Sequence, residues 1–223
     1  MDTKCSVFIA ASVDGFIARP DGNIEWLHRP EYECPVLRGL TYDEFMTTVD
    51  ALVMGRKTLD KVLSFPEWPY ENTRVVVLSR GEVVLPPELR DHVDVLAGDP
   101  LLIVAQLAAQ GLKHLYIDGG QTIQAFLAAG LINEITITRI PVLLGKGIPL
   151  FSQLGGELNL SLIDSSASDN GFVQSRYQVL AQACSVEKTG SDCSALGMLR
   201  STCCAAAASR NLHGTQRYLL KTT

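Results

Sequence analysis

Three segments of the chain place glycines, hydroxyls and cations directly after runs of apolar residues. The three segments are Met54-Gly55-Arg56-Lys57-Thr58, Leu78-Ser79-Arg80 and Asp118-Gly119-Gly120-Gln121-Thr122. In an open α/β sheet, ligands bind outside the carboxyl ends of the strands. We therefore expect the three segments to lie at one edge of a sheet and to bind a ligand that carries phosphate groups.

The first segment has the features of a phosphate-binding turn. An apolar strand runs into Gly55 and a helix begins at once, so free backbone N–H groups and the helix dipole favour an anion there. Thr58 can donate its hydroxyl, while Arg56 and Lys57 add positive charge. An ordinary strand-to-helix turn with surface cations has the same features, so this motif alone is not specific.

The second and third segments add more particular chemistry. Arg80 follows a strand of β-branched residues and suits bidentate contact with a phosphate such as the 2′-phosphate of NADPH, although a solvated arginine explains it equally well. The pair Gly119-Gly120 lets the backbone lie against a flat ring or a pyrophosphate, whereas an ordinary tight turn needs one glycine. The chain has no G-x-G-x-x-G motif, which argues against an ordinary Rossmann dehydrogenase.

Expected strands and helices alternate along the chain, which predicts an α/β fold with a mostly parallel twisted sheet flanked by helices. The expected strands are 5–11, 51–54, 74–78, 93–96, 114–117 and 134–140. The expected helices are 40–49, 57–63, 100–110 and 120–129. A C-terminal antiparallel hairpin is expected over 158–166 and 172–180, with Asn170-Gly171 at its turn.

Charge and hydropathy exclude several classes of protein. The net charge is -5, and no strong basic field favours a nucleic acid or a membrane surface as partner. No stretch approaches the roughly 18 apolar residues that a membrane helix needs. The apolar run over 6–13 is short, ends at Asp14 and lacks a cleavage site, unlike a signal peptide. We expect a cytoplasmic protein that acts on a small molecule.

The composition changes after about Gln182. We expect one domain over 1–182 and a low-order tail, rich in Ser, Ala and Cys, over 183–223. The tail could instead be a targeting or partner-binding segment. Four of the six cysteines lie in it without a C-x-x-C pair, so we expect no metal site. Cys5 and Cys34 are expected to be buried free thiols.

In order and spacing, these motifs resemble the dihydrofolate reductase superfamily. The matching segments are Ile9-Ala10-Ala11-Ser12-Val13-Asp14-Gly15-Phe16-Ile17-Ala18, Met54 to Thr58, Leu78 to Arg80 and Asp118 to Gln121. Within that superfamily, Asp118-Gly119-Gly120 and residues 140–151 look like the reductase domain of the bacterial bifunctional riboflavin deaminase-reductase. The resemblance covers roughly residues 4–180, and the zinc motif of the deaminase is missing, so we expect a stand-alone reductase.

The resemblance implies an NADPH-dependent homodimeric reductase and assigns coenzyme contacts residue by residue. Ala10 and Ala11 would line the nicotinamide and substrate floor, and Ile17 would belong to a mobile loop that begins at Asp14. The pyrophosphate and adenosine phosphate contacts would be Gly55, Arg56, Lys57 and Thr58. The adenosine contacts would be Leu78, Ser79 and Arg80. The contacts to the pyrophosphate and the nicotinamide ribose would be Asp118, Gly119, Gly120, Gln121 and Thr122.

The source of the proton for reduction is left open by the sequence. Asp14, Asp43 and Glu44 are the candidate catalytic carboxylates, and water is the alternative. Asp43 and Glu44 stand at a helix start, where acidic residues are favoured in any protein, and neither aligns cleanly with the pterin-binding carboxylate of dihydrofolate reductases. The cations considered for a substrate phosphate are Arg19, His28, Arg29 and Arg38.

The leading hypothesis is hydride transfer from NADPH to a C=N or C=O carbon of a small heterocyclic substrate, such as the ribosylaminopyrimidine of riboflavin biosynthesis. The alternatives are a dihydrofolate reductase or another small-molecule reductase, and a non-catalytic NADPH-binding module. In a weaker alternative, the tail over 183–223 carries the function and the domain serves as its scaffold. No nucleic acid, membrane or metal is expected as a partner.

Overall fold

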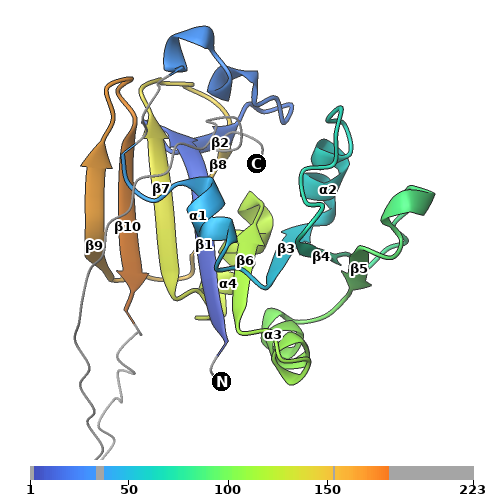
Figure 1. Ribbon diagram of the computed structural model, residues 1–223. Coiled ribbons are helices and arrows are strands. Elements are labelled where there is room, and N and C mark those ends of the chain that lie inside the picture. Colours follow the sequence, from blue (N-terminus) through green and yellow to red (C-terminus); the bar gives the residue numbers. More distant parts are fainter. Residues whose placement is uncertain (1–2, 34–37, 153, 181–223) are drawn as a thin grey trace, which may run out of the picture.

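The computed structural model describes residues 3–33, 38–152 and 154–180, and its centre is an eight-stranded sheet in the order β5-β4-β3-β6-β1-β7-β10-β9 (Figure 1). The strands are β1 (Lys4–Ser12), β3 (Ala51–Gly55), β4 (Arg74–Leu78), β5 (Val93–Leu96), β6 (His114–Asp118), β7 (Glu134–Ile140), β9 (Leu160–Ala167) and β10 (Val173–Val179). Neighbours from β5 to β7 run parallel, and the β9–β10 hairpin is antiparallel. The predicted α/β architecture and its C-terminal hairpin are confirmed.

Helices cover both faces of this sheet. On one face lie α3 (Pro100–Ala109) and α4 (Gly120–Ala128), and on the other lie α1 (Tyr42–Met46) and α2 (Arg56–Val62). Strand β1 is buried on both faces, as its continuous apolar run predicts. The short helices η1 (Glu25–Leu27), η2 (Pro30–Tyr32) and η3 (Pro87–Leu89) complete the order. A separate ribbon pairs β2 (Phe16–Ala18) with β8 (Ile148–Pro149).

The helix expected over 40–49 is wrong in length, because α1 spans Tyr42–Met46. Its start is fixed by a capping box, in which Thr41 Oγ1 accepts from the N–H of Glu44 at 3.2 Å and the Glu44 carboxylate accepts from the N–H of Thr41 at 3.0 Å. At its end, the hydroxyls of Thr47 and Thr48 each donate to a carbonyl three residues back, at 2.7 Å. These side chains satisfy carbonyls that a longer helix would pair with backbone N–H groups.

The segment before α1 is fastened to the C-terminal hairpin. The N–H of Leu40 donates to Gln174 Oε1 at 2.7 Å, and Gln174 Nε2 donates back to the Leu40 carbonyl at 2.9 Å. Gly39 lies so close to this amide that an added Cβ would come within 2.5 Å of Gln174 Oε1. The N–H of Arg38 donates to Ser168 Oγ at 2.9 Å. Strand β10 thereby sets where α1 begins over the sheet.

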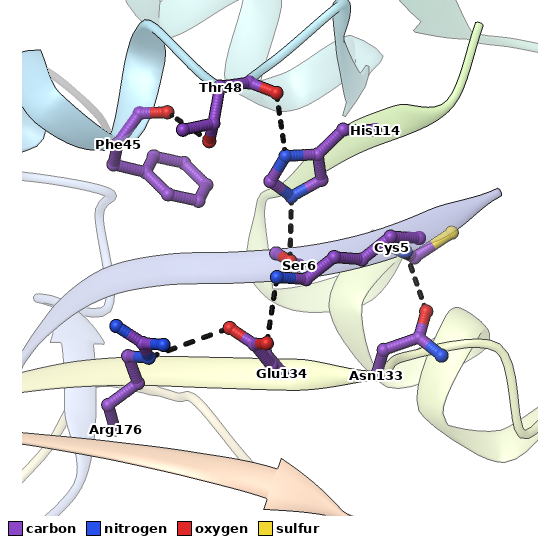
Figure 2. A network of polar contacts seen from close by, with 9 residues as sticks. Cys5, Ser6, Phe45, Thr48, His114, Asn133, Glu134 and Arg176 are labelled. Atoms are coloured by element: carbon purple, nitrogen blue, oxygen red, sulfur yellow. Dashed lines mark hydrogen bonds and ion pairs between the residues drawn. The ribbon is translucent and has the colours of Figure 1, made fainter. Parts of the chain in front are cut away.

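A polar network joins β1, β6 and β7 where these strands begin, far along the strands from the three predicted binding segments (Figure 2). His114 Nδ1 lies 2.8 Å from the Thr48 carbonyl, and His114 Nε2 lies 2.8 Å from Ser6 Oγ. A carbonyl can only accept, so Nδ1 carries the proton and Nε2 of the neutral ring accepts from the serine. Lys4 and Glu134 form an ion pair at 2.7 Å in the same network.

The geometry of His114 makes the stability of the protein depend on pH. Burial lowers the pKa of His114, Lys4 lowers it further, and the hydrogen bond to Thr48 acts in the opposite direction. The unfolded state therefore binds the proton more readily, so the stability is present above the unfolded pKa of about 6.5 and is lost as the pH falls through the folded value. We expect the free energy of unfolding in urea to decrease between pH 7.5 and pH 5. The decrease should be smaller in His114→Gln, and an equal decrease in both proteins would contradict this origin.

Two further expectations concern cysteines and membranes. Cys5 is a buried free thiol, as predicted, and burial raises its pKa to about 12. Cys34 and the tail over 183–223 lie outside the described residues. Within 3–33, 38–152 and 154–180, no helix has the length and apolar character needed to cross a bilayer, and no group of three or more metal-ligating side chains forms a candidate metal site.

Candidate functional site

The three segments singled out from the sequence lie at the ends of adjacent strands. Strand β3 lies between β4 and β6 (Figure 1). In register, Gly55 pairs with Leu78 and Met54 pairs with Asp118, so the carboxyl ends of all three strands meet at one edge of the sheet. This is the arrangement in which open α/β sheets bind ligands.

At this edge, glycines allow the starts of α2 and α4 to touch. Gly119 has a φ of 88°, and a Cβ added to it would overlap Thr58 Oγ1 at the start of α2. A Cβ on Gly55 would lie 2.9 Å from Thr122 Oγ1 at the start of α4. Only glycine at both positions lets the two helix starts approach this closely, because the hydroxyls of Thr58 and Thr122 already fill the space that a side chain would need.

The β2–β8 ribbon lies over the second glycine of the pair. A Cβ on Gly120 would lie 2.9 Å from Ile17 Cδ1 and 3.7 Å from the Pro149 carbonyl oxygen. One turn further along α4, Gln124 donates to the carbonyls of Pro149 and Leu150 at 3.2 and 3.0 Å. The structure thus brings Ile17 together with the paired glycines, although the ribbon itself was not predicted from the sequence.

We call the edge formed by Gly55, Gly119 and Gly120 the glycine cradle. Several other residues predicted to contact the coenzyme belong to the same strand ends and the loops that follow them. Arg56 donates from Nη1 to the Glu82 carbonyl at 2.9 Å, which ties α2 to the loop after β4. Ser79 shapes that loop, because its Oγ donates to the Gly81 carbonyl at 2.9 Å. Ala10 and Ala11 are buried near the end of β1, and Leu78 is half-buried. The exposed members of the set are Arg56, Lys57, Arg80 and Gln121.

Asp14 lies in a loop that it fastens. Its Oδ1 accepts from Ser12 Oγ at 2.6 Å and from the N–H of Leu144 at 3.1 Å, and its Oδ2 accepts from the N–H of Gly145 at 2.7 Å. The hydrogen bond from Ser12, followed by those from Gly145 and Leu144, holds the pKa of Asp14 below its usual value. The Asp14 carboxylate therefore stays ionised and joins the loop after β1 to the loop after β7.

The two helix carboxylates considered as catalytic groups occupy α1. Glu44 belongs to the capping box with Thr41, and Asp43 is exposed. Both positions suit the start of a helix, where carboxylates interact favourably with the helix dipole.

Asp118 is a buried acidic residue at the end of β6 with a raised pKa. It ends β6, is fully buried, and accepts the N–H of Gly119 through Oδ1 at 2.7 Å. Its Oδ2 has no hydrogen-bond partner among the described residues. Burial raises its pKa to about 6, against the opposing effect of the Gly119 hydrogen bond. Sequence reasoning placed Asp118 only among the coenzyme contacts; the available signal was an acid at the end of a buried strand, directly before two glycines.

Three of the four cations considered for a substrate phosphate have identifiable neighbours. Arg29 pairs with Glu31 at 3.6 Å, and Arg38 pairs with Asp169 at 3.6 Å. The pKa of His28 is lowered by burial and then by the nearby charge of Lys61. Arg19 is exposed.

Comparison with known proteins identifies the family. Residues 3–174 match the RibD C-terminal domain family. The chain belongs to this family. RibD C-terminal domains are reductase-like, which agrees with a ligand-binding edge built from glycine-rich strand ends. The resemblance drawn from the motifs is confirmed.

Relatives of this RibD C-terminal domain include uncharacterized proteins and solved structures. The uncharacterized protein YwjB of Bacillus subtilis (strain 168) is 36% identical over 166 residues, which are 73% of this chain and 90% of YwjB. A Shewanella sp. PV-4 protein with a provisional assignment to riboflavin biosynthesis is 42% identical, with a TM-score of 0.74, over 80% of this chain and 99% of that one. Dihydrofolate reductase from Enterococcus faecalis, solved with NADP(H), has 15% identity and a TM-score of 0.52 over 80% of this chain and 96% of that one, and shares the fold.

Proposed function

We propose that this protein is an NADPH-dependent reductase that transfers a hydride to a C=N or C=O carbon of a small heterocyclic substrate, such as a ribosylaminopyrimidine. The observation that carries the proposal is the meeting of three strand ends at one edge of the sheet, where glycines let the starts of α2 and α4 lie against each other. When bound, the coenzyme supplies the hydride. The protein binds and orients both partners and keeps water from the reacting atoms.

The glycine cradle fits a dinucleotide phosphate. A side chain at Gly55 or Gly119 would overlap Thr122 or Thr58, so glycine at these positions lets the starts of α2 and α4, with their N–H groups and hydroxyls, lie close together. The N–H groups at the start of α4 and the two threonine hydroxyls would hold the pyrophosphate. The exposed Arg80 lies beyond the end of β4, where a guanidinium would hold the 2′-phosphate that distinguishes NADPH from NADH.

We propose that Asp118 is the proton donor in the reduction. A carboxyl with a pKa of about 6 is partly protonated near neutral pH, and its Oδ2 has no partner among the described residues. The Asp14 carboxylate already accepts from the N–H groups of Leu144 and Gly145, and the Glu44 carboxylate already accepts from the N–H and hydroxyl of Thr41. Asp43 is exposed on α1. After hydride addition, Asp118 would donate its proton to the heteroatom of the reduced bond.

We expect Asp14 to support coenzyme binding and not to serve as the proton donor. Its carboxylate joins two loops whose far ends place Ile17 and Pro149 on Gly120. We therefore predict that Asp14→Ala raises the Kd for NADPH about tenfold, the equivalent of one to two lost hydrogen bonds. Fluorescence titration measures this Kd, and kcat at saturating NADPH should change less than threefold. A collapse of kcat with an unchanged Kd would instead make Asp14 the proton donor.

The function is tested by NADPH oxidation, followed at 340 nm, with a ribosylaminopyrimidine phosphate, dihydrofolate and small carbonyl compounds. We expect oxidation with the heterocyclic substrates and a preference for NADPH over NADH. Tight NADPH binding without oxidation by any compound would favour the non-catalytic module. Oxidation with dihydrofolate alone would favour a dihydrofolate reductase. Failure to bind NADPH would contradict the proposed reductase, the dihydrofolate reductase and the non-catalytic module alike.

We also propose a homodimer in the cytoplasm. The edge strand β9 exposes three large apolar side chains, which a second copy of the chain would cover. These side chains are Leu160, Leu162 and Ile163. Light scattering coupled to size-exclusion chromatography should give twice the chain mass of 24.2 kDa, and a monomer at all concentrations would contradict this proposal.

A further inference from the structure

Three polar groups lie buried together without hydrogen-bond partners among the described residues. They are Tyr42 Oη, Tyr70 Oη and Asp118 Oδ2. The exposed fractions of these residues are 6%, 2% and 0%. Burying an unsatisfied polar group destabilises a protein, so such groups are rare in native structures and call for a functional or solvent explanation.

The three groups come from three segments and share one face of the sheet. Tyr42 belongs to α1, and Tyr70 precedes β4. Both pack in one apolar cluster with Tyr116 of β6, whose ring lies 6.5 Å from that of Tyr42 in an edge-to-face arrangement. Asp118 follows Tyr116 by two positions on β6, so its side chain points to the same face. We call these residues the Tyr42–Tyr70–Asp118 cluster.

Electrostatic effects between the three side chains agree with this placement. Burial is the main cause that raises the pKa of Tyr42, followed by the charge of Asp118 and then that of Asp43. Burial also raises the pKa of Tyr70, followed by the charge of Asp118 and then Tyr42. No lysine or arginine in the described part of the chain is among the causes for these pKa values or for that of Asp118. Among the described residues, the cluster therefore has a carboxyl and two phenols but no cation that would balance an anion.

We propose that the Tyr42–Tyr70–Asp118 cluster is the polar subsite that receives the reacting end of the substrate, and that it selects an uncharged group with both a hydrogen-bond donor and an acceptor. The assignment rests on the proposed reductase function, because Asp118 directly precedes the glycine cradle. The two phenols donate to an acceptor atom of the ligand. Asp118 donates its proton to the reacting heteroatom when it is protonated, and its carboxylate accepts from a ligand donor when it is ionised. An anionic group is rejected, because it would meet a carboxyl and no cation.

The proposal predicts an unusual pattern for two conservative variants. Tyr42→Phe and Tyr70→Phe each remove a buried hydroxyl that has no partner among the described residues, so the urea midpoint of unfolding should stay equal or rise. Ligand binding at the cluster should weaken in both variants. Tyr116→Phe is the matched control, because its Oη donates to the Phe8 carbonyl at 2.8 Å within the same face. That variant should lose stability and retain ligand binding.

Binding is tested with probes that need no turnover. The neutral cyclic amide 2-pyridone carries an N–H next to a carbonyl, and 6-hydroxynicotinate is the same ring with a carboxylate. Saturation-transfer NMR at millimolar probe should show binding of 2-pyridone to the wild-type protein and none of 6-hydroxynicotinate. Tyr42→Phe and Tyr70→Phe should each reduce the 2-pyridone signal at least fivefold, whereas Tyr116→Phe should preserve it.

Several outcomes would overturn the subsite. These are equal signals for the two probes, an unchanged 2-pyridone signal in Tyr42→Phe and Tyr70→Phe, or a loss of stability in these variants as large as in Tyr116→Phe. A parallel NADPH titration separates this failure from a failure of the proposed function. Probe binding without NADPH binding would support the subsite and reject the reductase, and the reverse result would reject the subsite alone.

Discussion

Replacing Gly119 with valine will abolish NADPH binding, with a Kd raised at least about 100-fold, a loss of roughly 3 kcal/mol. Two effects act together. The φ of 88° lies in a region that β-branched residues avoid, and the new Cβ would overlap Thr58 Oγ1. Relief of this overlap would push apart the starts of α2 and α4, where we place the pyrophosphate. Fluorescence titration with NADPH measures the effect directly.

The control for Gly119→Val is the same substitution at Gly130. Gly130 has a φ of 67° and no heavy atom within 4 Å of an added Cβ, and it follows the end of α4 away from the cradle. Gly130→Val therefore introduces comparable backbone strain without touching the binding edge. It should lower the urea midpoint and leave the NADPH Kd within threefold of the wild type. An unchanged affinity in Gly119→Val would count heavily against the site.

The second large effect is expected from Asp118→Asn. The amide has the size of the carboxyl but donates no acidic proton, so kcat should fall about 10²- to 10⁴-fold, the usual contribution of a general acid. The Kd for NADPH should stay within threefold, because the glycine cradle is unchanged. Steady-state kinetics with a substrate that supports NADPH oxidation measures both quantities. A kcat within threefold of the wild type would exclude Asp118 as the proton donor.

Asp118→Asn should also raise the stability of the protein at pH 7, whereas the loss of a carboxylate that stabilises the fold would lower it. The folded state raises the pKa of Asp118 from 3.8 to about 6, so the stability associated with its neutral form is present at low pH and is lost as the pH rises through this interval. At pH 7 that loss is on the order of 3 kcal/mol at most. The asparagine side chain does not ionise, so the variant avoids this loss of stability and should unfold at a higher urea concentration than the wild type at pH 7.

Asp43→Asn is the control for the kinetic result. Asp43 is an exposed carboxylate on α1, the helix that carries Tyr42, and it was one of the candidates from the sequence. Its replacement should leave kcat and the NADPH Kd unchanged. A large loss of kcat in Asp43→Asn, combined with little effect in Asp118→Asn, would move the proton donor to α1.

Local sequence signals predicted most of the sheet. The strands β4, β5 and β7 have the predicted bounds, because each is rich in apolar or β-branched residues. Asp99 and Pro100 mark the start of α3, where the Asp99 side chain accepts from the N–H of Leu101. The neighbouring positions of Gly55, Leu78 and Asp118 followed from the rule that parallel strands end at one edge.

Other features depend on contacts between distant parts of the chain. The β2–β8 ribbon pairs Phe16 with Pro149 in segments too short to have a period. The bonding of Asp14 requires N–H groups 130 and 131 residues away, at Leu144 and Gly145. The raised pKa of Asp118 comes from burial, which no single position in a sequence specifies. For these reasons the meeting of the three segments at one edge was predictable, whereas the burial of Asp118 was not.

A crystal structure of the protein with NADP⁺ would show where the dinucleotide binds relative to the three strand ends. We expect density for the pyrophosphate against the main chain of Gly119 and Gly120 at the start of α4, with the adenosine toward Ser79 and Arg80. Density for the dinucleotide on another face of the sheet, or none at millimolar NADP⁺, would contradict the account.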